Sequence, residues 1–160
     1  MTIYLATDHT GFELKEKLKN ELEKKYDNVI DCGAYVVDPV DDYPDFISKA
    51  AQLVSGSPES RAFVIGGSGQ GEAMVANRYK GVRCAVFYGP VMPHTAVDAE
   101  GHTSTDTFEM VKLEREHNDA NILSIASRFV TDEDALKAVK IFLETPFSLA
   151  PRHMRRINKF

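Results

Sequence analysis

The feature that most limits how this chain can fold is the segment from Ala62 to Glu72, which reads Ala-Phe-Val-Ile-Gly-Gly-Ser-Gly-Gln-Gly-Glu. A short apolar run, typical of a buried strand, ends directly in a glycine-rich stretch, and a helical pattern from Ala73 to Tyr79 follows. A strand, a glycine loop and a helix N-terminus in this order bring backbone N–H groups together, where they can hold an anion. The segment therefore predicts an α/β fold with an anion-binding turn.

Glu72 indicates which kind of anion this turn would hold. The spacing from Gly66 to Gly71 is that of a phosphate-binding loop, but such a loop has lysine where Glu72 stands. A carboxylate suits a different task, in which it removes a proton from carbon while the loop holds the oxyanion that forms. Taken alone, the segment fits equally well a turn that serves tight packing, with Glu72 favoured by the helix dipole. A dinucleotide-binding fingerprint would need glycine in place of Glu72, and a hydrolase nucleophile elbow would need glycine in place of Gln70. The segment therefore matches neither of these motifs.

Short apolar segments alternate with helical patterns along most of the chain. We expect strands at 2–7, 28–32, 62–65, 84–88 and 122–126, and helices at about 11–25, 46–54 and 132–144. This alternation predicts an α/β fold with a Rossmann-like, doubly wound parallel sheet of five strands in three α-β-α layers. Ligands of such sheets bind beyond the carboxyl ends of the strands, where Asp8, Ser68 and Arg128 are expected.

Length, charge and cysteine content narrow the possible partners. A chain of 160 residues predicts one domain over 1–160, and its net charge of −5 argues against nucleic acid or an anionic membrane surface as partner. No apolar stretch is long enough for a membrane span, and no leader pattern precedes the first strand. Cys32 and Cys84 lack metal-ligand spacing and are expected to be free thiols in a reducing cytoplasm. No Cys, Asp or Glu completes a convincing metal set with His94 and His102, so no metal is expected.

Two segments depart from the alternation of strands and helices. Residues 89–108 are rich in Pro, Gly, Thr, Asp and His without a helical or strand period, so we expect a long inserted loop. It follows the carboxyl end of a strand, which favours a lid or an interface arm near the active-site edge, although a tolerated surface loop remains the alternative. The basic tail at 150–160 would present Arg152 and Arg156 on one face if it is helical.

Four motifs occur in one order along the chain. They are Thr-Asp-His-x-Gly-Phe-Glu-Leu-Lys at 7–15, the glycine loop at 66–72, Arg-Glu-His-Asn-Asp-Ala-Asn at 115–121, and Arg-His-x-x-Arg at 152–156. With these motifs the chain resembles the type B ribose-5-phosphate isomerases, a family that includes the galactose-6-phosphate isomerase subunits. The resemblance covers nearly the whole chain apart from residues 89–108. It implies a Rossmann-like homodimer or homotetramer that acts on a sugar phosphate at a subunit interface, without metal or cofactor.

The resemblance also implies a role for each catalytic residue. Asp8 and His117 would assist opening of the sugar ring, and Glu72 would carry the proton between C2 and C1. Ser68, together with amides of the loop, would hold the enediolate oxygens. Many members of the family have a catalytic cysteine in the glycine loop, whereas the nearest cysteine here, Cys84, lies on the next expected strand. The chain thus resembles the subgroup in which a glutamate is the base.

Substrate-binding residues are implied in the same way. Gly67, Gly69 and Gly71 of the loop, together with Asn118, would contact the sugar. The phosphate would be bound by one histidine and three arginines, which are His9, Arg128, Arg152 and Arg156. Arg128 would help from across the subunit interface. Taken singly, these residues also fit helix caps and a solvated basic end. Their expected position at one edge of the sheet is what favours a functional site.

Three functions remain open from the sequence. The leading one is a cofactor-free isomerase that interconverts ribose 5-phosphate and ribulose 5-phosphate. The second is the same chemistry on a phosphohexose such as allose 6-phosphate or galactose 6-phosphate. The third is a non-catalytic sugar-phosphate-binding module, which the acid–base set of Asp8, Glu72 and His117 argues against, because binding alone does not need a carboxylate facing an anion.

Overall fold

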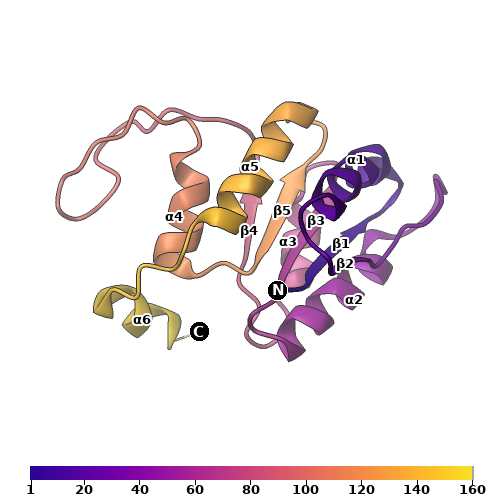
Figure 1. Ribbon diagram of the computed structural model, residues 1–160, viewed down its shortest axis with the longest axis horizontal. Helices are drawn as coiled ribbons and strands as arrows, with labels where there is room; N and C mark the ends of the chain where they lie inside the picture. Colours follow the sequence, from indigo (N-terminus) through magenta and orange to yellow (C-terminus); the bar gives the residue numbers. More distant parts are fainter. Residues whose placement is uncertain (160) are drawn as a thin grey trace.

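A single parallel sheet forms the centre of the molecule (Figure 1), whose computed structural model describes residues 1–159. The strands are β1 (Ile3–Thr7), β2 (Val29–Asp31), β3 (Arg61–Gly66), β4 (Cys84–Phe87) and β5 (Ile122–Ala126). Their order is β2-β1-β3-β5-β4, and every neighbouring pair is parallel. The five-stranded parallel sheet predicted from the sequence is confirmed.

Helices cover both faces of the sheet. On one face lie α1 (Phe12–Glu23), α4 (Glu109–Asn118) and α5 (Asp132–Glu144), and on the other α2 (Tyr43–Gly56) and α3 (Gln70–Ala76). A short 3₁₀ turn, η1 (His9–Gly11), links β1 to α1, and a C-terminal helix, α6 (Pro151–Ile157), follows α5. The predicted three-layer α-β-α arrangement is therefore also confirmed.

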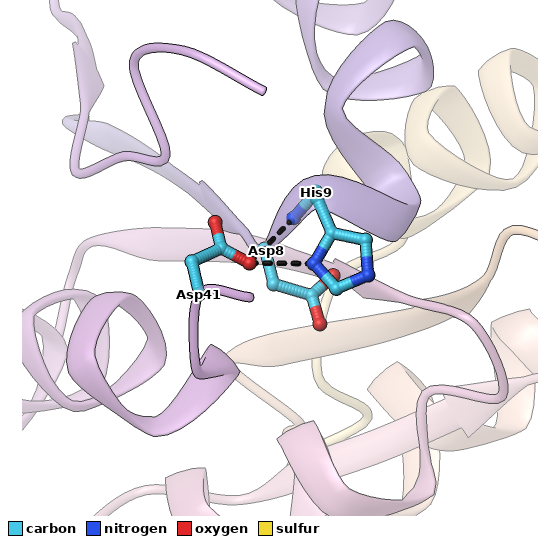
Figure 2. Close-up of side chains that lie close together, drawn as sticks. All are labelled: Asp8, His9 and Asp41. Atoms are coloured by element: carbon cyan, nitrogen blue, oxygen red, sulfur yellow. Dashed lines mark hydrogen bonds and ion pairs between the residues drawn. The ribbon is translucent and has the colours of Figure 1, made fainter. Parts of the chain in front are cut away.

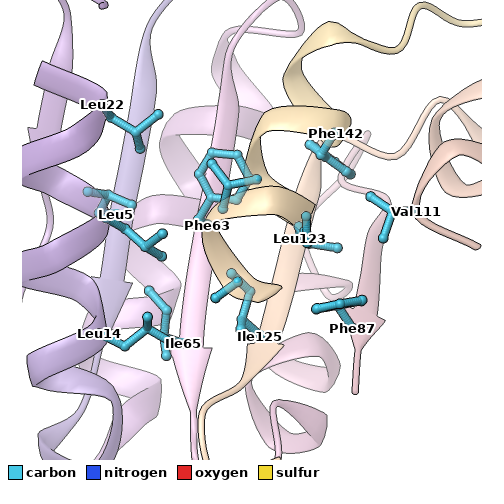
Figure 3. Packing of buried hydrophobic residues seen from close by; sticks show 14 of the residues in the cluster. Leu5, Leu14, Leu22, Phe63, Ile65, Phe87, Val111, Leu123, Ile125 and Phe142 are labelled. Carbon is cyan, nitrogen blue, oxygen red and sulfur yellow. The ribbon is translucent and has the colours of Figure 1, made fainter. Parts of the chain in front are cut away.

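The larger core lies between the sheet and the α1–α4–α5 face (Figure 3). Phe63 and Ile65 of β3 point to this face, while Ala62 and Val64 point to α2 and α3. The ring of Phe63 meets that of Phe142 on α5 edge to face, with centroids 5.8 Å apart. Because both faces are covered, the central strands are apolar at almost every position, which is why they are read so easily from the sequence.

The helix boundaries differ from the sequence expectation mainly at their starts. Helix α2 begins at Tyr43, about three residues earlier than expected, because Pro44 stands in its first turn. Proline is suited to that position, where its missing N–H would have no partner inside the helix. Helix α3 likewise begins at Gln70 rather than at Ala73. Over residues 1–159, none of the helices has the length and apolar character needed to cross a membrane.

Residues 89–108, called here the insertion loop, contain neither helix nor strand, as expected. The loop leaves the sheet after β4, and near its base Val91 N donates to Thr107 O at 2.8 Å. It extends far from the sheet as a long arm before it returns to the start of α4 (Figure 1). Its tip is a turn held by Asp98, which accepts from the backbone N–H groups of Glu100 and His102 and pairs with the His102 ring at 2.5 Å.

Candidate active site

One group of the predicted site residues lies at the carboxyl edge of the sheet. Asp8 follows β1, Ser68 follows β3 and Arg128 follows β5. Parallel strands bring these three segments to the same edge, as the sequence predicted. The side chains and loop amides at this edge are called here the carboxyl-edge group.

Glu72 lies directly against the glycine loop. A Cβ atom placed on Gly66 would come within 1.8 Å of Glu72 Oε1, so a residue other than glycine would displace the carboxylate. Glu72 is only 5% exposed. Burial raises the pKa of its carboxyl group, and the nearby charge of Asp8 raises it further. A carboxylate whose pKa is moved toward neutrality is well matched to removing a proton from carbon.

The loop takes its shape from Gly69, which has φ +71° in the left-handed region that favours glycine. The hydroxyl of Tyr43 lies 2.6 Å from where a Cβ of Gly71 would be, so this side chain closes one side of the loop. Tyr43 was not among the predicted site residues. It stands at the start of α2, 28 positions before Gly71 in the chain, and no motif links the two.

Arg128, which the resemblance implied to help from across a subunit interface, lies beside the glycine loop of its own chain. Its guanidinium lies 3.2 Å from where a Cβ of Gly67 would be, so Arg128 belongs to the same carboxyl-edge group as its own glycine loop. Backbone hydrogen bonds explain this placement, because Ser127 N and Arg128 N donate to Gly66 O and Gly67 O at 2.9 and 3.2 Å. The turn after β5 is thereby fastened to the turn after β3.

His9 is held by an aspartate that the sequence reading missed (Figure 2). Asp41 Oδ1 lies 2.6 Å from His9 Nδ1 and accepts from His9 N at 3.1 Å. This hydrogen bond raises the pKa of His9, to which the charges of Asp8 and Asp41 add, while Arg128 lowers it. His9 is thus favoured as a cation, with Nε2 available for an anion.

Asp8 caps the 3₁₀ turn. The sequence already allowed this capping role as the alternative to a catalytic one. Its Oδ1 accepts from Thr10 N at 2.9 Å and from Thr10 Oγ1 at 2.5 Å. Asp8, His9 and Asp41 bring one possible metal-ligand atom each to within 4.8 Å of one another. Because His9 Nδ1 is engaged by Asp41 Oδ1 and Asp8 Oδ1 by Thr10, we interpret this cluster as an ion pair beside a capping aspartate, although Asp41 Oδ2 is buried without a hydrogen-bond partner among the described residues.

The remaining predicted residues lie elsewhere, at the amino edge of the sheet. Helix α4 runs opposite to the strands, so its last residues, His117 and Asn118, lie at the edge where β5 begins. Arg83, just before β4, donates from Nε to Asn118 O at 3.0 Å. A strand of five residues separates the two edges by roughly 15 Å. The expectation that all site residues share one edge is therefore wrong within a single chain.

Helix α6 joins this second set, called here the amino-edge group. The ring of His153 on α6 lies 4.1 Å, centroid to centroid, from the ring of His117. His153 is buried, and its Nδ1 meets Ser148 Oγ at 2.9 Å. Arg152 and Arg156 lie one helical turn apart on α6, as predicted for a helical tail. A cavity of about 760 Å³ opens beside Asn118 at this edge.

Most of the motif at 115–121 has a structural task. The buried Arg115 pairs with Asp119 at 2.8 Å, and Asp119 ends α4 with φ 44°. Asn121 accepts from Arg83 N at 2.8 Å and donates to Gly81 O at 2.8 Å. These contacts fix the end of α4, on which His117 and Asn118 are the motif residues predicted for the site.

Arg152 is already engaged in this structure. Both terminal nitrogens of its guanidinium bind the carboxylate of Glu100 at the tip of the insertion loop, with Nη2 3.0 Å from Oε2. Its Nε donates to His153 Nε2 at 3.1 Å. The loop therefore leaves the carboxyl edge, near which it was expected to pass, and its tip contacts the amino-edge group.

Neither cysteine is placed to replace Glu72. Cys32 is buried and Cys84 lies on β4, and both are free thiols, as expected. Burial raises the pKa of Cys32 to about 11 and that of Cys84 further. Since the thiolate is the reactive form, both thiols are held in their unreactive state.

A Rossmann-like sheet whose glycine loop faces a buried carboxylate defines a class of α/β enzymes that move protons on small anionic substrates. A protein-family model described as Ribose/Galactose Isomerase matches residues 3–104 and 101–160 of this chain. The chain belongs to this family. The two matched stretches overlap at 101–104, inside the insertion loop.

Individual relatives agree with the family over almost the full chain. The chain is 40% identical over 158 residues to ribose-5-phosphate isomerase B of Mycolicibacterium paratuberculosis, which covers 99% of this chain and 88% of that protein. Among solved structures, ribose-5-phosphate isomerase B of Mycoplasma genitalium with bound ribulose-5-phosphate has a TM-score of 0.84 at 36% identity, over 99% of this chain and 92% of that one. The Thermotoga maritima enzyme has a TM-score of 0.82 at 38% identity, over 99% and 95%.

Proposed function

We propose that this chain is an aldose–ketose isomerase that interconverts ribose 5-phosphate and ribulose 5-phosphate through an enediolate, with Glu72 as the base. The observation that carries the proposal is the buried Glu72 carboxylate against the glycine loop, which suits proton transfer beside a developing oxyanion. A relative of 36% identity holds ribulose-5-phosphate, which supports this choice of substrate. The scheme uses no cofactor, because the proton only moves between neighbouring carbons.

In this scheme the carboxyl-edge group carries the proton transfer. Glu72 takes the proton from C2 and returns it to C1, so one base serves both half-reactions. Ser68 and the amides of Gly69 and Gly71 stabilise the enediolate oxygens, each donor contributing about 3–4 kcal/mol to the transition state. Because the pKa of Glu72 is raised by burial, its carboxylate is a stronger base than that of an exposed glutamate.

The phosphate is the handle that positions the reacting carbons. His9, whose protonated form Asp41 stabilises, and Arg128 would bind it from the carboxyl-edge group. Arg152 and Arg156 on α6 would supply two further forks that match phosphate oxygens. Asp8 and His117 would assist ring opening by moving a proton between the ring oxygen and the C1 hydroxyl.

The two edge groups are too far apart to serve one sugar phosphate within a chain. We therefore propose that the site is composite, with the carboxyl-edge group of one protomer facing the amino-edge group of another in a homodimer or a larger homo-oligomer. The open cavity beside Asn118 fits this assembly, since it would receive a neighbouring protomer. Closed two-fold symmetry would build two identical sites per dimer.

An isomerisation assay with a panel of sugar phosphates tests this proposal. The panel contains ribose 5-phosphate, ribulose 5-phosphate, allose 6-phosphate, galactose 6-phosphate and unphosphorylated ribose. We expect the highest kcat/KM with the pentose phosphates and little turnover of ribose. A preference for a hexose phosphate would move the chain to the second substrate class, and binding without turnover of any sugar would indicate a non-catalytic module.

A further inference from the structure

The insertion loop brings an acidic side chain to a residue that the proposed function assigns to phosphate. Glu100 and Arg152 are separated by 52 positions in the chain, yet the carboxylate meets the guanidinium with both oxygens. This is the fork-to-fork geometry in which arginine also binds phosphate. With Nε bound to His153, all three nitrogens of Arg152 have a partner.

The loop tip is built to present Glu100. Asp98 accepts from Glu100 N and His102 N, both at 3.0 Å, and Val97 N donates to His102 O at 2.8 Å. Gly101 completes the turn with φ +87°, a conformation that other residues rarely adopt. The carboxylate therefore projects from a closed turn of residues 97–102 and does not depend on a chance side-chain position in an extended chain.

We propose that Glu100 is a specificity-determining residue that occupies the Arg152 fork when the site is empty and must be displaced by the phosphate of the substrate. The inference rests on the proposed function, because it takes Arg152 as a phosphate ligand. The pair lies at the surface, with side-chain exposures of 33% for Arg152 and 49% for Glu100. Solvent screens a pair at this exposure, so a phosphate group that offers the same fork and more charge can replace the carboxylate.

Charge determines which ligands can make this replacement. A phosphate ester carries a charge of about −1.5 to −2 near neutral pH, compared with −1 for the carboxylate of Glu100. It also offers the same pair of oxygen acceptors to the guanidinium. A neutral sugar has only hydroxyl groups to offer and leaves the ion pair in place. Glu100 thus reduces the affinity for every phosphate ligand slightly and excludes uncharged sugars from the fork.

The test compares Glu100→Gln with the wild type and with Glu23→Gln, a substitution that removes the same charge from an exposed position of α1. Inorganic phosphate is the probe, and its dissociation constant is measured by calorimetry, together with its inhibition constant and the KM of ribose 5-phosphate. We expect Glu100→Gln to lower all three constants by roughly two- to five-fold with kcat unchanged. Glu23→Gln should leave them at wild-type values.

A double-mutant cycle assigns the effect to the fork. Arg152→Ala should weaken phosphate binding, and adding Glu100→Gln to it should change nothing further. The inference is overturned if Glu100→Gln leaves phosphate binding unchanged or weakens it, which would make Glu100 a positioning residue. It is overturned equally if the gain persists without Arg152, or if Arg152→Ala binds phosphate as tightly as the wild type. Absence of isomerisation with the whole sugar panel, with these phosphate effects intact, would instead contradict the proposed function alone.

Discussion

At the scale of single residues, Glu72 is the position whose chemistry is most clearly marked. Replacing it by glutamine keeps its shape and removes its ability to accept a proton. We expect Glu72→Gln to lower kcat by roughly 10²-fold or more with little change in KM, since the loss falls on the chemical step. Steady-state kinetics with ribose 5-phosphate measures both constants.

Cys84→Ala is the matched control for that experiment. The pKa of this thiol is raised by burial, and no step of the scheme uses it, so turnover should stay near the wild-type level. Loss of turnover in Cys84→Ala together with its retention in Glu72→Gln would refute the assignment of the base.

The His9–Asp41 pair predicts a dependence on pH. The pKa of His9 is raised by its hydrogen bond to Asp41, so in the proposed scheme a protonated His9 binds phosphate and should lose affinity as pH rises through that raised pKa. Asp41→Asn removes the charge that holds the proton, so we expect the pKa of His9 to fall toward 6.5 and the rise of KM to begin at a lower pH. Proton–carbon NMR titration of the histidine ring and KM as a function of pH follow the two effects. An unchanged His9 titration in Asp41→Asn would show that the pair does not control the charge.

The shape of the glycine loop could be predicted from the sequence because its key contact is local. Gly66 and Glu72 are six positions apart, and the strand–loop–helix order fixes their approach. Asp41 and Tyr43 could not be found in this way. Asp41 lies in the irregular segment before α2 and Tyr43 at the first position of α2, and only tertiary packing brings them to His9 and Gly71.

At the scale of elements, helix α4 carries an unusual buried acid. Glu114 is 8% exposed, its Oε2 has no hydrogen-bond partner among the described residues, and burial raises the pKa of its carboxyl group to about 8. Its folded pKa exceeds the ordinary value, so the folded protein binds the extra proton. The stabilisation is present below about pH 4.5 and is lost as pH rises through 8.

Glu114→Gln should remove this dependence while keeping the side-chain shape. We expect the wild type to lose about 2–4 kcal/mol of unfolding free energy between pH 5 and pH 9 through this residue, and the variant to lose correspondingly less. Urea unfolding at a series of pH values measures the difference. Parallel curves for the two proteins would mean that Glu114 is ionised in the folded state.

The elements themselves were predictable because strands buried on both faces are continuously apolar and the helices between them have a 3.6-residue period. The position of the amino-edge group was not predicted from the sequence. Its motif residues were assumed to join the others, although a helix between two parallel strands runs opposite to them and must end at the amino edge. His117 follows this rule. The contact of Glu100 with Arg152 joins two segments without regular period, so no pattern in the sequence pointed to it.

At the scale of the whole molecule, the composite site predicts complementation between inactive variants. Glu72→Gln and His117→Ala protomers, mixed in equal amounts and allowed to exchange, form mixed dimers with one intact and one doubly altered site. About a quarter of the wild-type activity should return, since half of the dimers are mixed and each has one working site of two. Activity after exchange, with exchange followed by mass spectrometry of a labelled protomer, is the measurement.

The position of Arg128 supplies the control for this mixing experiment. Because Arg128 lies beside Gly67 of its own chain, Glu72→Gln mixed with Arg128→Ala places one defect in each carboxyl-edge group, and no activity should return. The proposed division of the site would be wrong if Glu72→Gln regained activity when mixed with Arg128→Ala but not when mixed with His117→Ala. Arg128, and not His117, would then be the residue that the second protomer supplies.

Because the two edge groups of one chain lie far apart, catalysis should also depend on the concentration of assembled dimer. In the proposed scheme a lone protomer holds Glu72 and Arg128 out of reach of Arg152 and Arg156, so specific activity should fall when the enzyme is diluted below the dissociation constant of the dimer. Adding Glu72→Gln protomers, which cannot turn over substrate, should then restore activity by supplying the missing arginines to scarce wild-type chains. An inactive copy would act as an activator of dilute enzyme, and an assay at falling enzyme concentration, with and without that copy, would detect it.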